Sequence, residues 1–166
     1  TGVGLILGTP YQFESKIYNS AVLITDGEIS FVQHKRNLPN YDVFDDKRLF
    51  SYGNNSEPVY FKNKRILITI CEDLWITLND PRNPNDGYND VASLVKDHKY
   101  DLLINLSASP FEINKQKTRR DLFSNISKKY QVPIIFCNQY GANDELIFDG
   151  NSMVFNDKGE LTNIAH

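Results

Sequence analysis

Short apolar segments, separated by charged and turn-forming residues, run through the whole chain. The clearest is the mostly β-branched run Ile66–Ile70, which follows Lys64-Arg65 and leads directly to Cys71. A continuous apolar run of this length is typical of a strand covered on both faces of a sheet. Segments of similar character predict further strands at Val3–Leu7, Ser20–Thr25, Ile29–Gln33, Val59–Lys62, Tyr100–Leu106, Val132–Cys137, Ser152–Phe155 and Leu161–Ile164.

Turn residues and helical spacing predict how these strands are connected. Asp26-Gly27, Asn63-Lys64 and Asn156–Gly159 each separate two strands and predict hairpins. Apolar residues four positions apart predict a helix over Lys115–Tyr130, and a shorter helix is expected at Val91–Lys96. The order strand, helix, strand between residues 100 and 137 implies a parallel, right-handed unit, so the expected fold class is α/β.

Proline and polar residues predict where the chain leaves the sheets. The strand at Ile29–Gln33 leads into Leu38-Pro39, and proline cannot join a central ladder, so Lys35 is expected at a sheet rim. The first strand is expected to end at Gly8-Thr9-Pro10 for the same reason. The segment Asn79–Gly87 is rich in Asn, Asp and Pro and predicts a surface loop close to the site.

Composition narrows the classes of partner. The chain has 166 residues, 40% of them hydrophobic, which is enough for the core of one domain or a large part of one. A net charge of −3, from 18 basic and 21 acidic residues that are well mixed, argues against nucleic acid or anionic membrane as a partner. No apolar run approaches the roughly 20 residues of a membrane span, and no signal-peptide pattern is present.

Cysteine and histidine usage points to location and excludes a metal site. Cys71 and Cys137 do not suggest a disulfide framework, so a reducing compartment is expected and the predicted location is cytoplasmic. Cys137 is interpreted as a buried structural thiol. The histidines His34, His98 and His166 share no ligand spacing, so no metal site is predicted. A Cys/His pairing of one of them with Cys71 stays open.

Cys71 is the candidate nucleophile. The acidic pair Glu72-Asp73 follows it and suits a turn or the first turn of a helix. A thiol held at such a junction is expected to feel the positive end of the helix dipole, which favours the thiolate. The alternative interpretation is a plain buried cysteine at the end of a core strand.

Several motifs accompany this cysteine in a fixed order. They are Lys35-x-x-Leu38-Pro39-x-Tyr41, Phe44-Asp-Asp-Lys-Arg48, Ile70-Cys-Glu-Asp-Leu-Trp75, Asn105-Leu-Ser-Ala-Ser-Pro110 and Asp149-Gly-Asn-Ser152. Together they resemble the nitrilase superfamily of carbon-nitrogen hydrolases, and within it the glutaminase domains of glutamine-dependent NAD synthetases. The resemblance implies that residues 1–166 form one partial carbon-nitrogen hydrolase domain, with part of a four-layer αββα sandwich.

The resemblance also implies catalytic roles. Cys71 would attack a carbon to form a thioester, and Lys35 would place its ammonium against the developing oxyanion. The third member of the family's triad, a glutamate base, falls upstream of Thr1, and none of Glu14, Glu28 and Glu57 lies in a matching motif. The 166 residues alone are therefore expected to be inactive or impaired. Asp46 stands where the family usually has a glutamate supporting the lysine; a solvated loop carboxylate is the alternative.

Substrate contacts follow from the same resemblance. Tyr41 and Phe44 would wall the pocket, Ser109 and Lys115 would bind the amino-acid head of glutamine, and Glu72 would meet its ammonium group. Asp149, Gly150, Asn151 and Ser152 would form a loop that shapes the site. Other interpretations stay open: core aromatics for Tyr41 and Phe44, a helix-approach cap for Ser109 and helix surface for Lys115.

The implied function is a glutamine amidohydrolase that releases ammonia for NAD synthesis. Its partner would be the synthetase domain of the same polypeptide, absent from this sequence, and ATP and Mg are expected only there, with no cofactor in this domain. Exposed sheet edges also suggest a homo-oligomer. The alternatives are another amidase or nitrilase of the superfamily, acting on a nitrile, carbamoyl or ω-amide substrate, and a non-catalytic binding or scaffold remnant suggested by the missing base.

Overall fold

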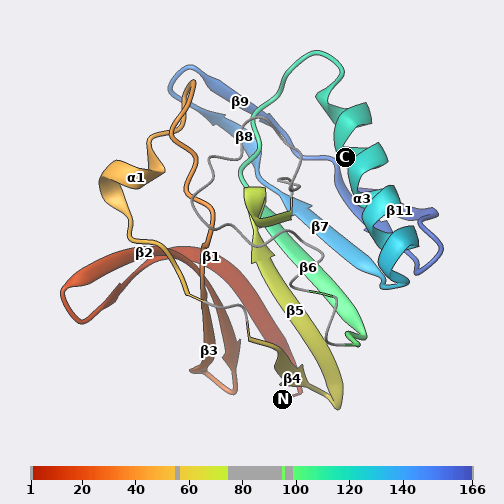
Figure 1. Cartoon of the computed structure of the whole chain (residues 1–166), viewed down its shortest axis with the longest axis horizontal. Helices are drawn as coiled ribbons and strands as arrows, with labels where there is room; N and C mark the ends of the chain where they lie inside the picture. The colour runs from red at the N-terminus through yellow and green to blue at the C-terminus, as the bar shows by residue number, and fades with distance from the viewer. Residues whose placement is uncertain (1, 55–56, 75–94, 96–98, 166) are drawn as a thin grey trace.

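The computed structural model describes residues 2–54, 57–74, 95 and 99–165. Its strands form a three-stranded sheet, a six-stranded sheet and a separate two-stranded hairpin, and one long helix lies against the larger sheet (Figure 1). Within the described residues no helix is both long enough and apolar enough to cross a membrane.

The three-stranded sheet is an antiparallel meander of β1 (Gly4–Phe13), β2 (Lys16–Thr25) and β3 (Glu28–His34). Asp26 and Gly27 both have positive φ, as the predicted hairpin turn requires. The prediction that the first strand ends at Gly8-Thr9-Pro10 is wrong, because β1 continues through Pro10, which pairs with Asn19. Proline is tolerated there because β1 is an edge strand of this sheet.

The six-stranded sheet has the order β11-β10-β7-β6-β5-β4. Its strands are β4 (Val59–Phe61), β5 (Lys64–Ile70), β6 (Leu102–Ser107), β7 (Ile134–Asn138), β10 (Ser152–Phe155) and β11 (Leu161–Ala165). β5, β6 and β7 are parallel, and α3 (Lys115–Tyr130) connects β6 to β7, which confirms the predicted parallel unit. The β4–β5 turn is formed by Lys62 and Asn63, one residue earlier than predicted.

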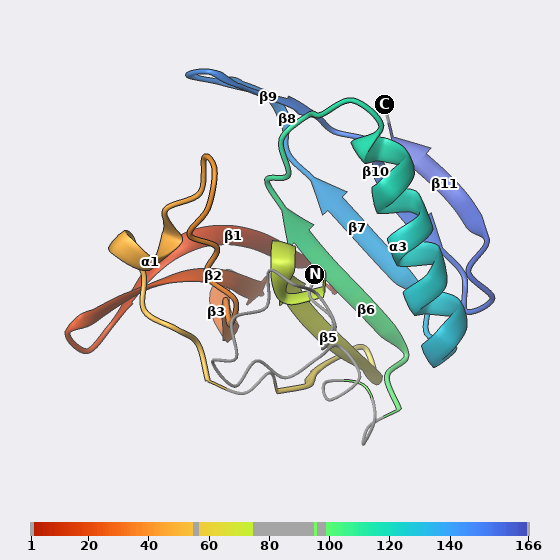
Figure 2. The same cartoon turned by 45° about the horizontal axis from the view of Figure 1, so that its top comes forward.

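Alternate residues of β5 explain why its apolar run is continuous. Leu67 points to the face covered by α3, in a core that includes Phe123 and Phe136. Ile68 and Ile70 point to the opposite face, where they form a second core with Ala21 and Leu23 of β2 in the smaller sheet. The described chain therefore has three layers, sheet, sheet and helix, and Figure 2 shows α3 lying over β10 and beside β7.

The parallel register brings three strand ends to one edge of the sheet. Ile70 pairs with Leu106, and Leu106 pairs with Cys137. Cys71 directly after β5, Ser107 at the end of β6 and Asn138 at the end of β7 therefore lie at neighbouring positions. The carboxyl ends of parallel strands are where α/β proteins usually bind ligands.

One helix and one hairpin were not predicted. α1 (Asp46–Leu49) is a single turn, and β8 (Tyr140–Asn143) pairs with β9 (Leu146–Asp149) as a hairpin whose apolar alternation is weak. The predicted loop Asn79–Gly87 lies outside the described residues. Of the predicted helix Val91–Lys96 only Val95 is described, and it is helical and buried.

Candidate active site

Cys71 lies where β5 ends and the chain turns. Its backbone φ is +46°, in the left-handed region that residues other than glycine rarely adopt. One turn of 3-10 helix, Cys71–Leu74, follows, and the Cys71 carbonyl accepts a hydrogen bond from Asn105 Nδ2 (3.1 Å) on β6. The strained turn brings the thiol to a cavity at the edge of the sheet.

Lys35 approaches this cysteine from the other sheet. It directly follows β3, its N–H donates to the Asn19 carbonyl (2.7 Å), and its side chain is only 5% exposed. Its ammonium forms an ion pair with the Asp46 carboxylate at the start of α1, and that side chain is 18% exposed. Asp46 is therefore the partner of a buried lysine, which disfavours the alternative of a solvated loop carboxylate.

The charges of this pair act on the thiol. Burial lowers the pKa of the Lys35 ammonium, but the nearby Cys71 and Asp46 outweigh that effect, and its pKa lies above the ordinary lysine value. Burial raises the pKa of the Cys71 thiol, and Lys35 offsets only part of the rise. The direction of this shift is opposite to the expected preference for a thiolate, because desolvation favours the neutral thiol.

Asp73 joins the two loops that carry Lys35 and Cys71. Its Oδ1 accepts hydrogen bonds from the N–H groups of Arg36 (3.1 Å) and Asn37 (2.8 Å). Its Oδ2 accepts one from the N–H of Ile70 (3.0 Å). Backbone hydrogen bonds to a carboxylate are among the stronger ones in proteins, so this buried side chain fixes the lysine loop against the cysteine turn.

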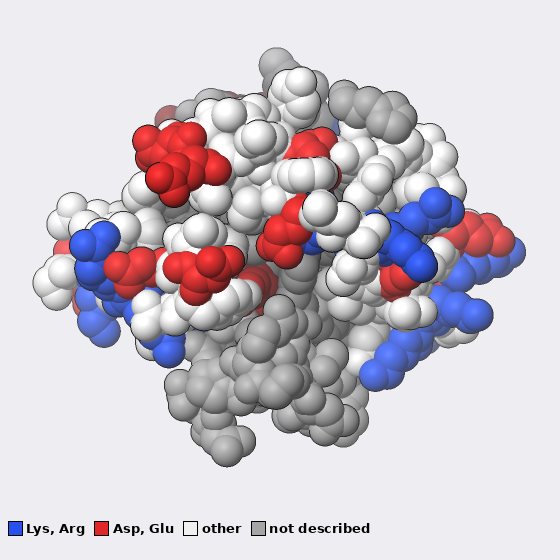
Figure 3. Space-filling view, turned by 90° about the horizontal axis from the view of Figure 1, so that it is seen from above, with Lys and Arg blue, Asp and Glu red and all other residues white. Residues whose placement is uncertain are grey.

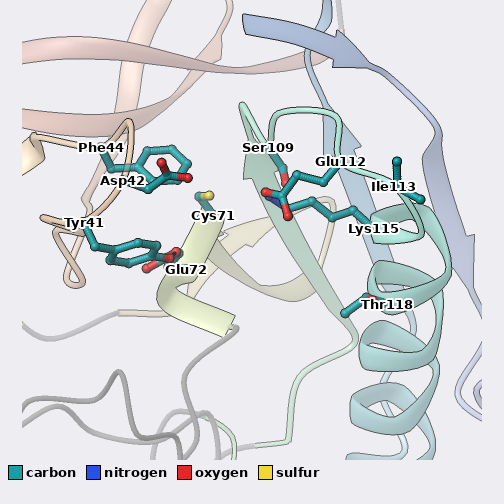
Figure 4. Close-up of a pocket in the computed structure, with 10 residues that line it drawn as sticks. All are labelled: Tyr41, Asp42, Phe44, Cys71, Glu72, Ser109, Glu112, Ile113, Lys115 and Thr118. Carbon is teal, nitrogen blue, oxygen red and sulfur yellow. Dashed lines mark hydrogen bonds and ion pairs between the residues drawn. The ribbon is translucent and has the colours of Figure 1, made fainter.

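A cavity of about 330 Å³ opens beside Cys71 (Figure 4). It is lined by Tyr41, Asp42, Phe44, Cys71, Glu72, Ser109, Glu112, Ile113, Lys115 and Thr118. Cys71 and Phe44 also line an adjoining cavity of about 580 Å³, which contains Lys35 and Asp46. The structure thus brings together all eight residues predicted for the site.

One wall of the cavity is formed by two aromatic side chains and one acidic side chain. Tyr41 and Phe44 contact each other edge to face, with ring centroids 5.7 Å apart. The Tyr41 hydroxyl donates to Glu72 Oε1. Among the described residues, buried Glu72 Oε2 has no hydrogen-bond partner. An unpaired buried carboxylate oxygen is costly, so this wall is suited to a donor or a cation from a ligand.

The opposite wall carries hydroxyl and ammonium groups. Ser109 follows β6, and Lys115 begins α3, where its ammonium pairs with Glu112. In Figure 4 these three residues face Cys71 from the side opposite Tyr41 and Glu72. Figure 3 shows acidic side chains near the middle of the molecule's upper face, with most Lys and Arg side chains toward its edges.

Three supporting residues were missed in the sequence: Arg119, Asn138 and Asn105. Arg119 is fully buried, and Asn138 Oδ1 accepts a hydrogen bond from the N–H of Ser109 (2.9 Å). Asn105 Nδ2 binds both Thr69 Oγ1 and the Cys71 carbonyl. Asn105 lies within β6 and Asn138 ends β7, and a polar residue in each of these apolar strands was the signal that could have identified them.

Asp149–Ser152 forms the turn between β9 and β10. Gly150 and Asn151 both have positive φ, as tight turns often require, and they connect β9 of the two-stranded sheet to β10 of the six-stranded sheet. The Gly150 carbonyl accepts a hydrogen bond from Asn138 Nδ2 (2.9 Å), and Asp149 pairs with Arg119 (2.7 Å). The turn therefore supports the Ser109 side of the cavity from behind.

Cys137 corrects a prediction. It is exposed and lines the larger cavity, whereas the sequence suggested a buried structural thiol. Its neighbours Phe136 and Asn138 point to the covered face of β7, so the alternation along the strand places the thiol on the opposite face. Among the described residues no group of three or more His, Cys, Asp or Glu side chains is placed to hold a metal ion.

Comparisons with known proteins agree with this geometry. Residues 1–165 match the family model of carbon-nitrogen hydrolases. The chain is 43% identical over 152 residues to glutamine-dependent NAD(+) synthetase of Synechocystis and 39% identical over 162 residues to that of Thermotoga maritima. These matches cover 90% and 98% of this chain but only 27% and 26% of the two relatives.

Superposition on solved structures also relates this chain to carbon-nitrogen hydrolases. A glutamine-dependent NAD+ synthetase from Acinetobacter baumannii superposes with a TM-score of 0.85 at 34% identity, over 98% of this chain and 29% of that one. A carbon-nitrogen hydrolase from Helicobacter pylori superposes with a TM-score of 0.82 at 21% identity, over 99% of this chain and 58% of that one. The nitrilase-type fold predicted from the motifs is therefore confirmed.

Proposed function

Because the chain belongs to the carbon-nitrogen hydrolase family, we propose that the cavity beside Cys71 hydrolyses the carbon-nitrogen bond of a small amide. The observation that carries the proposal is the placement of a buried, ion-paired lysine beside a thiol at a strained strand end. A positive charge fixed next to the nucleophile is what stabilises the oxyanion formed in acyl transfer.

The reaction would proceed in two steps. The Cys71 sulfur attacks the amide carbon, the carbon-nitrogen bond breaks, and ammonia leaves with the proton it acquires. Water then attacks the thioester, the carbon-sulfur bond breaks, and the carboxylic acid is released. Because burial raises the pKa of the Cys71 thiol, both steps need a base, and the family resemblance assigns this role to a glutamate.

Lys35 would act on the oxyanion of both steps. Its raised pKa keeps it charged across the physiological range, and its pairing with Asp46 fixes its position. A preorganised donor costs no rearrangement when charge develops, and one such donor is typically worth about 3 kcal/mol of transition-state stabilisation.

We further propose glutamine as the substrate. Glu72 Oε2, which lacks a partner among the described residues, suits the α-ammonium group, and Lys115 with Ser109 suits the α-carboxylate. The relatives named above are glutamine-dependent NAD synthetases, which supports ammonia supply to NAD synthesis. The synthetase domain, with its ATP and Mg, would be the partner on the same polypeptide; a homo-oligomer and a cytoplasmic location stay predictions.

Mass spectrometry after incubation with a diazo-ketone analogue of glutamine tests this function. We expect one adduct on Cys71, lost in Cys71→Ala and retained in Cys137→Ala. Exposed Cys137 serves as an internal control, because a reagent that reacts without a binding site should modify it first. Labelling of Cys137 alone, in a folded chain, would contradict the proposal, and protection by another amide but not by glutamine would change the substrate.

A further inference from the structure

Arg119 is the most fully buried charged residue behind the candidate site. It lies on α3, and its side chain is 0% exposed. Its described hydrogen-bond partners belong to the Ser109-Pro110 segment and to Asp149. Its Nε donates to Ser109 Oγ (3.2 Å), one terminal nitrogen donates to the carbonyls of Ser109 and Pro110 (both 2.9 Å), and the other pairs with Asp149 Oδ1 (2.7 Å). A buried guanidinium is tolerated only when its donors are satisfied in this way.

These contacts determine the direction in which the Ser109 hydroxyl can donate its proton. Because Arg119 Nε donates to Ser109 Oγ, the hydroxyl proton must point away from Arg119. The backbone of Ser109 is fixed at both ends, since its N–H donates to Asn138 and its carbonyl accepts from Arg119. Ser109 is thereby held as a hydrogen-bond donor on the same cavity wall as Lys115.

We propose that Arg119 is a positioning residue for the carboxylate subsite formed by Ser109 and Lys115, an inference that rests on the proposed glutamine hydrolysis. Arg119 does not line the cavity. It orients the donor that does, and Asp149, from the β9–β10 turn, anchors the guanidinium on its other side. The Asp149–Ser152 motif thus serves substrate binding through Arg119.

Glutamine binding in the Cys71→Ala background, measured by calorimetry, tests the proposal without turnover. Arg119→Lys keeps the charge but loses the planar fork, and we expect it to raise the Kd for glutamine about tenfold, the size of one hydrogen bond to a charged group. The Kd for 4-aminobutanamide, which lacks the carboxylate, should change less than about twofold. Arg120→Lys, at the adjacent exposed position, is the matched control and should leave both values unchanged.

A double-mutant cycle asks whether Arg119 acts through Ser109. In a Ser109→Ala background, Arg119→Lys should cost less than about threefold in glutamine affinity. An equal loss for both ligands, or an undiminished loss in the Ser109→Ala background, would overturn the positioning role. If the Cys71→Ala chain itself binds no glutamine, both the proposed function and the positioning role fail. If Arg119→Lys binds glutamine normally in that background, only the positioning role fails.

Asp149→Asn keeps the test decisive if Arg119→Lys does not fold. The amide still accepts from Arg119 but removes the charge that anchors it. We expect a several-fold loss of glutamine affinity with 4-aminobutanamide binding retained. Unchanged glutamine binding in Asp149→Asn would contradict the anchoring role.

Discussion

Two lysine-carboxylate pairs line the two adjoining cavities of the candidate site, and they differ in burial. Lys35 and Asp46 are 5% and 18% exposed, and they are held by elements of different parts of the fold. Lys115 and Glu112 are 14% and 61% exposed and lie three residues apart at the start of α3. A buried pair holds a permanent charge in place, whereas a pair with an exposed partner can exchange that partner for a ligand. The first pair suits oxyanion stabilisation and the second suits substrate binding.

Removing the buried lysine should have the largest effect. We expect Lys35→Met to slow modification of Cys71 by the diazo-ketone analogue on the order of 10³-fold, because the oxyanion loses its fixed positive charge. Mass spectrometry of the adduct over time measures this rate. Lys115→Met is the control and should slow the reaction only at low reagent concentration, through weaker binding; equal effects of the two variants at saturation would erase the distinction between the pairs.

Removing the buried carboxylate should chiefly lower stability. Asp46→Asn leaves the Lys35 ammonium buried without its partner, and we expect a loss of about 3 kcal/mol, the lower end for a broken buried pair because Asp46 is partly exposed. Asp45→Asn is the matched control, since Asp45 pairs with Arg48 on the surface, and its cost should stay below about 1 kcal/mol. Urea unfolding measures both, and equal values would contradict the difference in burial.

The buried lysine should also control the pH dependence of the thiol. Burial raises the pKa of Cys71, so in Cys137→Ser its alkylation by iodoacetamide should still accelerate with pH above the ordinary thiol range. Because Lys35 lowers that pKa, Lys35→Met should move the profile to still higher pH. Lys115→Met should leave it in place. A profile that Lys35→Met leaves unchanged would show that the ammonium does not act on the thiol, and a shift to lower pH would contradict the sign of its effect.

Lys115, whose partner Glu112 is exposed, should affect affinity more than stability. Lys115→Met should raise the Kd for glutamine about tenfold in the Cys71→Ala background, as expected for the loss of one contact to a carboxylate. Its free energy of unfolding should change by less than about 1 kcal/mol. A strong loss of stability with unchanged binding would assign Lys115 to structure instead.

Releasing Lys115 from its exposed partner Glu112 should have the smallest effect, and in the opposite direction. Glu112→Gln removes the carboxylate that competes with the substrate for the Lys115 ammonium. We expect the Kd for glutamine to fall about twofold, with stability unchanged, because exposed pairs contribute little. Weaker glutamine binding in this variant would mean that Glu112 itself contacts the ligand.

The sequence predicted the parts of the site that depend on local pattern. Cys71 after a buried strand, Lys35 at a sheet rim and the helix at Lys115–Tyr130 all follow from periodicity and motif, and the structure places them accordingly. The sequence did not predict that β1 extends through Pro10 or that β8 and β9 form a hairpin. Edge position and hairpin pairing depend on neighbours that periodicity does not reveal.

The burial of individual side chains also could not be predicted from the sequence. Arg119 reads as helix surface beside Arg120, and only the docking of the β9–β10 turn and the Ser109 loop buries it. Cys137 reads as core because its strand is apolar, yet it points to the face opposite Phe136. The rise in the pKa of Cys71 also comes from tertiary burial, which sequence neighbours do not specify.

The Asp73 carboxylate has a consequence for the order of folding. Its hydrogen bonds join residues 36 and 37, which follow one sheet, to residue 70 at the end of the other. Sliding one sheet past the other by a single residue, about 3.3 Å, would break them. A folding intermediate with both sheets formed but not yet docked would therefore hold Lys35 and Cys71 apart from each other, so recovery of Cys71 reactivity during refolding reports the final docking step.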